Sequence, residues 1–268
     1  MKPIYILITT LLITNSQINA EIIMGVVPQQ SPLVLIKAWS PIAKYLSEKT
    51  GEKISFKTEK SIDKFEKVLH SGGYDFAYMN PYHYISANQL QGYTAGLRAA
   101  KDIKGILVAK DVNVMQRALD KEIVFLFPSP IAFAATLLTK YDLIKKYGVS
   151  IEKLNEAKYV NSHDSVYKGI SRGIGDIGGG IERTFKNLKD IKTKNSLKIV
   201  HTTKAYPSHP IAFHKSMPNE IKNKIITALL NMPKSYLKKL SIKKLVKTQD
   251  KEYDSIKEIT TKLNIIPK

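Results

Sequence analysis

Polar side chains able to bind a small molecule follow several apolar segments of this chain, each where the apolar segment ends. Amides, hydroxyls, imidazoles, carboxylates and one guanidinium are represented among them. Three of these places are also expected helix starts, where free backbone N–H groups and the helix dipole favour negative charge. A serine there, taken singly, would only cap its helix, but the whole set predicts a site for a small anionic or zwitterionic ligand. Its members are Gln29, Gln30, Ser31, Tyr78, Asn80, Tyr82, His83, Ser129, His163, Asp164, Ser165, Glu182, Arg183 and His209.

The sequence contains none of the common catalytic motifs. No nucleophile stands beside a base, the six histidines include no i, i+4 pair of the zinc-protease type, and no G-x-S-x-G segment is present. Gly173, Gly175 and Gly178 spell G-x-G-x-x-G, but they precede and run through an expected strand, whereas a dinucleotide site needs them between a strand and a helix. We therefore expect a binding protein that is not an enzyme and that uses no metal and no cofactor.

Strands and helices alternate in the order that would gather the polar set at one edge. Strand, helix and strand joined by short connections predict βαβ units with parallel pairing, and ligands bind beyond the carboxyl ends of such strands. Helices are expected from Pro32 to the stop at Gly51, from Ser61 to the glycines that follow it, and over 131–148. The expected strands are 21–27, 53–57, 74–79, 105–110, 122–128, 157–162, 175–180, 197–203 and 210–215.

These elements fall into two sets of similar size, so the expected fold is α/β with two lobes. Each lobe is expected to be a mainly parallel sheet flanked by helices, with the ligand cleft between the lobes. Residues 21–104 form the first lobe, to which 215–268 return as C-terminal helices, and residues 105–214 form the second. Alternation along the strand at 74–79 predicts that Tyr74, Phe76 and Tyr78 pack on one face of the first sheet.

The N-terminal segment has the layout of a secretory signal peptide over residues 1–20. Lys2 is followed by an apolar stretch and a small residue, Ala20, at the expected cleavage point. An uncleaved anchor is the alternative, but the apolar stretch is roughly half the ~20 residues that a membrane-spanning helix needs. No cysteine is present, so neither disulfides nor a lipid-modified thiol are available. A mature, monomeric periplasmic protein beginning at Glu21 is expected.

The formal charge of +19 raises the question of nucleic-acid binding. The lysines are spread along the whole chain and greatly outnumber the arginines, whereas bidentate recognition of phosphate and bases prefers arginine. Nucleic acid is therefore not an expected partner. A positive field can instead speed the capture of a small anion.

Several stretches, in this order, resemble the phosphate/phosphite/phosphonate-binding family of periplasmic solute-binding proteins. They are GVVPQQSPLVLIKAWSPIAKYLSEKTG, YDFAYMNPYHY, FPSPIAFAATLL, SHDSVYKGISRG with GDIGGGIERTF, and PIAFHKSMP. The resemblance implies a type II periplasmic-binding fold that closes on its ligand and serves an ATP-driven importer, with a permease as partner.

The resemblance also implies roles for individual residues. The family's histidine at a helix start matches His163, with Asp164 after it, and the carboxylate positions correspond to Glu182 and His209. Cleft tyrosines are matched by Tyr78 or Tyr82. The hydroxyl-rich helix start of phosphonate binders reads PIAFA at 130–134 here, so its side-chain hydroxyls are missing.

The leading hypothesis is therefore a periplasmic solute-binding protein of an ABC importer for a phosphonate-, phosphite- or phosphate-like solute. A sensing module that presents its closed form to a membrane histidine kinase is the alternative with the same fold. An exported enzyme is a third hypothesis, against which the lack of catalytic signatures argues.

Overall fold

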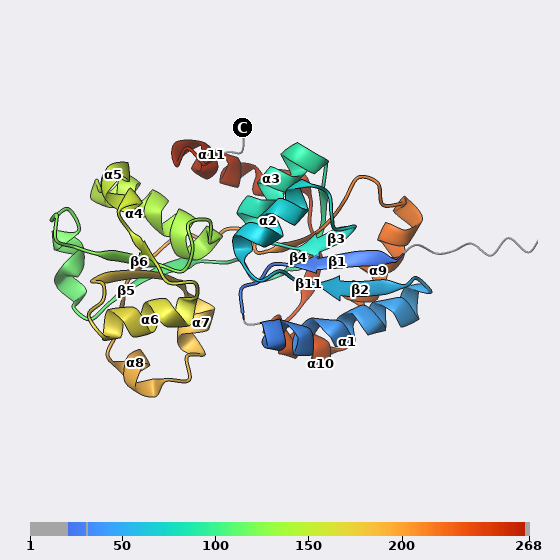
Figure 1. Ribbon diagram of the computed structural model, residues 1–268, viewed down its shortest axis with the longest axis horizontal. Coiled ribbons are helices and arrows are strands. Elements are labelled where there is room, and N and C mark those ends of the chain that lie inside the picture. The colour runs from blue at the N-terminus through green and yellow to red at the C-terminus, as the bar shows by residue number, and fades with distance from the viewer. Residues whose placement is uncertain (1–20, 31, 266–268) are drawn as a thin grey trace, which may run out of the picture.

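The computed structural model describes residues 21–30 and 32–265. The expected signal peptide at 1–20 and the expected ligand residue Ser31 lie outside this part of the chain. The helices and strands form two lobes side by side, which Figure 1 shows with the second lobe at the left and the first at the right. Among the described residues, no helix is both long enough and apolar enough to cross a membrane.

The first lobe is built on a six-stranded sheet with the order β11-β4-β10-β3-β1-β2. Its strands are β1 (Ile22–Val26), β2 (Ile54–Lys57), β3 (Phe76–Tyr78), β4 (Thr94–Ala99), β10 (Pro210–Phe213) and β11 (Leu245–Lys247). Its helices are α1 (Pro32–Thr50), α2 (Ile62–His70), α3 (Pro81–Gln91), α9 (Asn219–Leu230), α10 (Lys234–Lys239), η3 (Asp250–Tyr253) and α11 (Asp254–Lys262). Apolar side chains of α1, α9 and α10 cover one face of the sheet, and those of α2, α3 and α11 cover the other.

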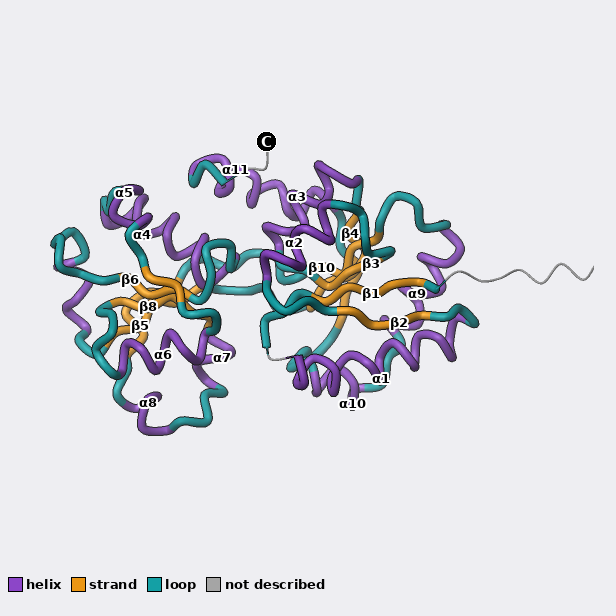
Figure 2. The backbone as a smooth tube through the Cα atoms, viewed as in Figure 1, coloured by secondary structure: helices purple, strands orange, loops and turns teal. Residues whose placement is uncertain are grey.

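The second lobe is built on a five-stranded sheet with the order β7-β6-β8-β5-β9. Its strands are β5 (Gly105–Ala109), β6 (Phe125–Phe127), β7 (Lys158–Tyr159), β8 (Ile177–Ile181) and β9 (Lys198–Thr202). Its helices are η1 (Val112–Arg117), the π-helix η2 (Phe133–Leu138), α4 (Thr139–Tyr147), α5 (Ile151–Asn155), α6 (His163–Ser171), α7 (Glu182–Lys186) and α8 (Ile191–Asn195). Figure 2 shows that the strands of each lobe lie between layers of helix.

The two-lobed α/β fold agrees with the sequence, but three details differ. The sheets are mixed, because β10 runs antiparallel to β3 and β4, and β5 runs antiparallel to β8 and β9. Residues 210–213, placed in the second lobe from the sequence, form β10 at the centre of the first sheet. Tyr74 packs with α2 on the face of the sheet opposite Phe76 and Tyr78. Its ring lies over Gly25, so a Cβ atom added to Gly25 would lie 2.5 Å from the Tyr74 ring.

The glycine-rich strand β8 lets helices approach the second sheet closely. A Cβ atom on Gly179 would lie 2.0 Å from the carbonyl oxygen of Ala135 in η2, and one on Gly180 would lie 2.2 Å from the hydroxyl of Tyr167 in α6. Gly105 in β5 is similar, at 2.1 Å from the carbonyl oxygen of Ala134. The backbone of η2 therefore lies directly on the sheet, as expected where a strand lacks side chains. These glycines therefore allow η2 and α6 to pack closely on the sheet.

Two connecting segments join the lobes, one between β4 and β5 and one between β9 and β10. They pair with each other through an isolated antiparallel bridge, in which Ile103 and Tyr206 exchange backbone hydrogen bonds of 2.8 and 3.0 Å. Helix α11 lies over both lobes: its apolar side chains pack against α3 and η2, and the Tyr141 hydroxyl donates to the Glu258 carboxylate at 3.3 Å.

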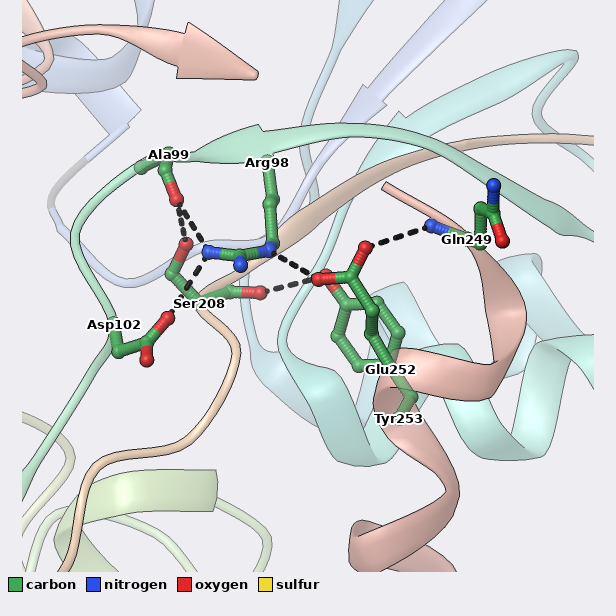
Figure 3. A network of polar contacts seen from close by, with 7 residues as sticks. All are labelled: Arg98, Ala99, Asp102, Ser208, Gln249, Glu252 and Tyr253. Carbon is green, nitrogen blue, oxygen red and sulfur yellow. Dashed lines mark hydrogen bonds and ion pairs between the residues drawn. The ribbon is translucent and has the colours of Figure 1, made fainter. Parts of the chain in front are cut away.

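The lobe-one ends of both connecting segments are fixed by a polar network, shown in Figure 3. The Arg98 guanidinium, at the end of β4, is 3.0 Å from carboxylate oxygens of both Asp102 and Glu252. The Ser208 hydroxyl donates to the carbonyl oxygen of Ala99 at 2.9 Å, and the Tyr253 hydroxyl donates to the carbonyl oxygen of Ser208 at 3.0 Å. One arginine therefore ties the first connecting segment to η3, while Ser208 ties the second connecting segment to the first.

Candidate functional site

The cleft between the lobes contains three adjoining spaces, which we call the inner cavity, the outer compartment and the hinge compartment. The inner cavity has a volume of about 30 Å³, the outer compartment about 230 Å³ and the hinge compartment about 410 Å³. The inner cavity is lined by polar residues, by the start of η2 and by Ala132 just before it. These residues are Gln29, Asn80, Ala132, Phe133, Ala134, Ala135, Asn161, Ser162, His163 and His209. These residues follow β1, β3, β6 and β7 or precede β10, so strand ends of both lobes build the cavity.

Helix starts place several of these side chains. Asn80 precedes α3 and accepts a 2.8 Å hydrogen bond from the backbone N–H of His83, with Pro81 in the first turn. Its side-chain amide donates at 3.2 Å to the carbonyl oxygen of Ile131 in the second lobe. In the second lobe Ser162 caps α6, accepting a hydrogen bond from the Ser165 N–H at 3.1 Å, and so fixes His163 in the first turn.

Three aromatic rings form one wall of the cleft. Trp39 of α1 lies 5.0 Å from Tyr78, and Tyr78 lies 5.4 Å from His209, measured between ring centroids. The Gln29 amide donates to the His209 Nε2 atom at 2.5 Å, which places the imidazole proton on Nδ1. The Arg183 guanidinium of α7 lies beside Tyr78, since both residues line the outer and hinge compartments. Burial raises the pKa of the Tyr78 hydroxyl, and the positive charge of Arg183 opposes this rise. The two lobes are therefore in contact across the cleft.

The imidazoles of the inner cavity are neutral at pH 7. Burial, followed by the positive charge of Arg183 and the neighbouring His83 and His163, lowers the pKa of His209 to about 3. Burial, with Arg183 second, lowers the pKa of His163 to about 4. Each ring therefore offers one N–H donor without carrying a charge of its own. Arg183 supplies the positive charge beside them.

Nine of the residues predicted from the sequence line the three spaces. The inner cavity is lined by Gln29, Asn80, His163 and His209. The outer compartment is lined by Gln30 and Asp164, and the hinge compartment by Glu182. Tyr78 and Arg183 line both the outer and the hinge compartment. Glu182 pairs there with Lys186, so it is not a free partner for an ammonium group.

Four predicted residues lie elsewhere. Tyr82 and His83 point into the core between α2 and α3, where His83 packs 5.5 Å from the Phe65 ring and neither of its ring nitrogens has a partner in the described structure. Ser129 is buried beside the cavity with its hydroxyl unpaired in the described structure, and Ser165 is exposed on α6. Ser31 is outside the described residues.

Several residues of the cleft were not predicted from the sequence. Trp39 is part of the aromatic wall of the cleft. It is the only tryptophan in the sequence, and this rarity could have marked it as a candidate ligand-binding residue. Asn161, Thr184 and Asn187 also line the cleft. The lysines of the hinge compartment gave no signal, because they resemble the many other lysines of a basic chain.

Comparisons with known proteins agree with this architecture. Residues 24–253 match the family described as "ABC transporter, phosphonate, periplasmic substrate-binding protein". The structure of PhnD1 from Prochlorococcus marinus in complex with methylphosphonate superimposes with a TM-score of 0.81 at 19% sequence identity, covering 92% of this chain and 99% of that one. A binding-protein component of an ABC phosphonate transporter from Pseudomonas aeruginosa superimposes with a TM-score of 0.79 at 15% identity, covering 91% of this chain and 86% of that one. At these identities the superpositions show the shared two-lobed fold, and the match of the family over residues 24–253 shows that the chain belongs to the periplasmic substrate-binding proteins of phosphonate ABC transporters.

Proposed function

We propose that the inner cavity, together with the adjoining outer compartment, holds the phosphorus oxyanion of a small phosphonate, phosphite or phosphate. As a member of its family the protein is a periplasmic solute-binding component of an ABC importer and not an enzyme, with a small ligand and a permease as its partners. The observation that carries the oxyanion assignment is the set of uncharged donors from both lobes, Gln29, Asn80, His163 and His209. They lie beside the Arg183 guanidinium, which pairs with no carboxylate among the described residues.

Backbone amides replace the missing hydroxyls in this proposal. The first N–H groups of a helix have no partner within it, and Ala132 provides no side-chain cap for η2. Phe133, Ala134 and Ala135 line the inner cavity at this helix start. Because Gly105 and Gly179 hold η2 against the sheet, these amides keep a fixed place from which to bind an oxyanion.

The hydrogen-bond donors of the site come from both lobes, and this explains why the lobes close on the ligand. Gln29, Asn80 and His209 belong to the first lobe and His163 and the η2 amides to the second, so a bound oxyanion gains its full set of hydrogen bonds only when the lobes meet. The closed state is therefore favoured by the contacts that it alone makes. A closed, loaded protein is the form presented to the permease.

Calorimetry tests the ligand class directly. We expect heat from methylphosphonate, phosphite or phosphate and none from acetate. Heat from carboxylates or cations alone would overturn the oxyanion assignment. His163→Ala should weaken binding at least tenfold, because a hydrogen bond to a charged group contributes about 1.5–3 kcal/mol. Ser165→Ala, on the same helix turn but away from the cleft spaces, is the matched control and should bind like the unaltered protein.

We further propose that residues 1–20 are a signal peptide removed before Glu21 and that the mature protein is a monomer. Mass spectrometry of the protein recovered from the periplasm measures the cleavage point, and light scattering measures the oligomeric state. The family match favours an importer component over the alternative, a module that signals to a histidine kinase.

A further inference from the structure

The hinge compartment is far larger than the inner cavity, at about 410 Å³ against about 30 Å³. It lies between α7 of the second lobe, the connecting segments and the loop after α10. Its volume is in the range of roughly 300–1,000 Å³ that is typical of small-molecule sites. A methyl substituent on a phosphonate leaves most of this space without ligand.

The walls of the hinge compartment combine an apolar surface with a cationic rim. Ile103, Ile181, Ile242 and the ring of Tyr78 supply apolar surface. The rim cations that pair with no carboxylate in the described structure are Lys101, Lys104, Arg183 and Lys243.

The two carboxylates of the hinge compartment do not neutralise this rim. Asp102 is bound by Arg98, and Glu182 by Lys186. The pKa of the Glu182 carboxyl is held below its usual range mainly by Lys186, and Lys101 and Lys104 contribute, so these lysines lie close to it across the hinge. The rim therefore retains positive charge after both carboxylates are counted.

The hinge compartment adjoins the inner cavity. Ile103, Ile181 and His209 line both spaces, and Tyr78 and Arg183 stand between the hinge and outer compartments. A ligand whose oxyanion occupies the inner cavity can extend its organic part past His209 along the isoleucines, and the end of that part then meets the lysines.

We propose that the preferred ligand carries a second anionic group, a carboxylate or a phosphate, joined to its phosphorus oxyanion by a short apolar linker. The linker lies on the isoleucines of the hinge compartment, and the second anion lies at Lys101, Lys104 and Lys243. This inference rests on the oxyanion site proposed above and adds the chemistry of the substituent. Without the second anion, lobe closure leaves the rim cations facing one another without compensation, which disfavours the closed state.

Calorimetric titration with two matched series of probes tests the proposal. The first series is the ω-phosphonocarboxylates of three to six carbons, and the second is the alkylphosphonates of the same chain lengths. We expect at least one phosphonocarboxylate to bind about tenfold more tightly than its alkylphosphonate partner. In the triple variant Lys101→Ala/Lys104→Ala/Lys243→Ala this advantage should vanish. The affinity for alkylphosphonates should stay the same or rise, because the uncompensated rim charge has been removed.

A second triple variant controls for net charge. Lys57→Ala/Lys64→Ala/Lys67→Ala removes three exposed lysines of β2 and α2 that line none of the three cleft spaces, and should keep the tenfold preference. Equal affinity for the two series, or a preference that survives removal of the hinge lysines, overturns the second-anion inference and leaves the oxyanion site standing. Failure of both series to bind overturns the oxyanion site and this inference together.

Discussion

The side chain of Asn80 hydrogen-bonds both lobes at once: its oxygen accepts from the His83 N–H at 2.8 Å and its nitrogen donates to the Ile131 carbonyl oxygen at 3.2 Å. The first bond caps α3 within the first lobe, and the second exists only while the lobes are in contact. A single amide therefore couples a local element of the first lobe to the closed arrangement of the cleft.

Asn80→Ala should reduce stability and ligand affinity together. Loss of the cap lowers the free energy of unfolding by about 1 kcal/mol. Loss of the bond to Ile131, together with loss of the Asn80 donor to the oxyanion, weakens methylphosphonate binding at least tenfold, since a hydrogen bond to a charged group alone contributes about 1.5–3 kcal/mol. Urea unfolding and calorimetry measure the two effects. Ser61→Ala is the control, because Ser61 caps α2 without touching the second lobe. Equal affinities of the two variants would contradict the coupling.

His83 should make the protein sensitive to acid. Burial, with the nearby His70 as a second cause, lowers the pKa of His83 to about 3. The unfolded chain takes up a proton at this residue near pH 6.5 and the folded chain does not, so the free energy of unfolding falls as the pH drops below about 6.5. Between pH 7 and pH 5 this residue accounts for a loss of about 2 kcal/mol.

His83→Leu should remove that part of the acid sensitivity. Chemical unfolding of both proteins at pH 7, 6 and 5 measures it, and between pH 7 and pH 5 the unaltered protein should lose about 2 kcal/mol more than the variant. Curves that run parallel over this range would show that the imidazole is protonated in the folded protein.

Gly179→Ala should displace the start of η2. The added Cβ atom would lie 2.0 Å from the backbone oxygen of Ala135 and 2.4 Å from the Phe127 ring, so backbone must move. We expect a loss of more than about 2 kcal/mol in the free energy of unfolding and weaker oxyanion binding. Gly51→Ala is the control: it meets no neighbour within 4 Å but has a φ of +76°, so it should lose only about 1 kcal/mol and bind normally. Normal binding by a folded Gly179→Ala would remove η2 from the site.

Arg98→Lys should loosen the attachment of the first connecting segment. An ammonium group cannot bind Asp102 and Glu252 in the forked arrangement that the guanidinium uses. We expect a loss of about 1–2 kcal/mol in the free energy of unfolding, since hydrogen bonds between charged groups are lost at a site with little exposure. Urea denaturation at low and high salt checks this, and a difference from the unaltered protein that disappears at low salt would argue against the network.

Most of the architecture could be predicted from the sequence because the early strands are short and apolar and because α1 and α2 show a clear helical period. Helix α3 was missed, since Pro81 to Ala87 are all buried and leave no polar face to reveal a period. Strands β4 and β11 were missed for a related reason: Gly96 and Arg98 interrupt the first, and β11 has three residues within a lysine-rich run.

Part of the site could be predicted from the rule that ligands of α/β sheets bind beyond the carboxyl ends of the strands. That rule placed Gln29, Asn80 and His163 at one edge before their contacts were known. It failed for Tyr82 and His83 because a helix begins at Pro81, so each following side chain turns by about 100° and these two face α2. The hinge lysines depend on how two distant connecting segments cross, which local sequence does not encode.

The bridge between Ile103 and Tyr206 limits the freedom of the two lobes. Two separate connections would let the lobes twist and slide as well as close, but segments bonded to each other, and held by Arg98 and Ser208 at one end, bend together as a single ribbon. We therefore expect rotation about this ribbon to be the main relative motion of the lobes. A single pair of spin labels, one on each lobe, then reports the whole opening and closing cycle as one distance.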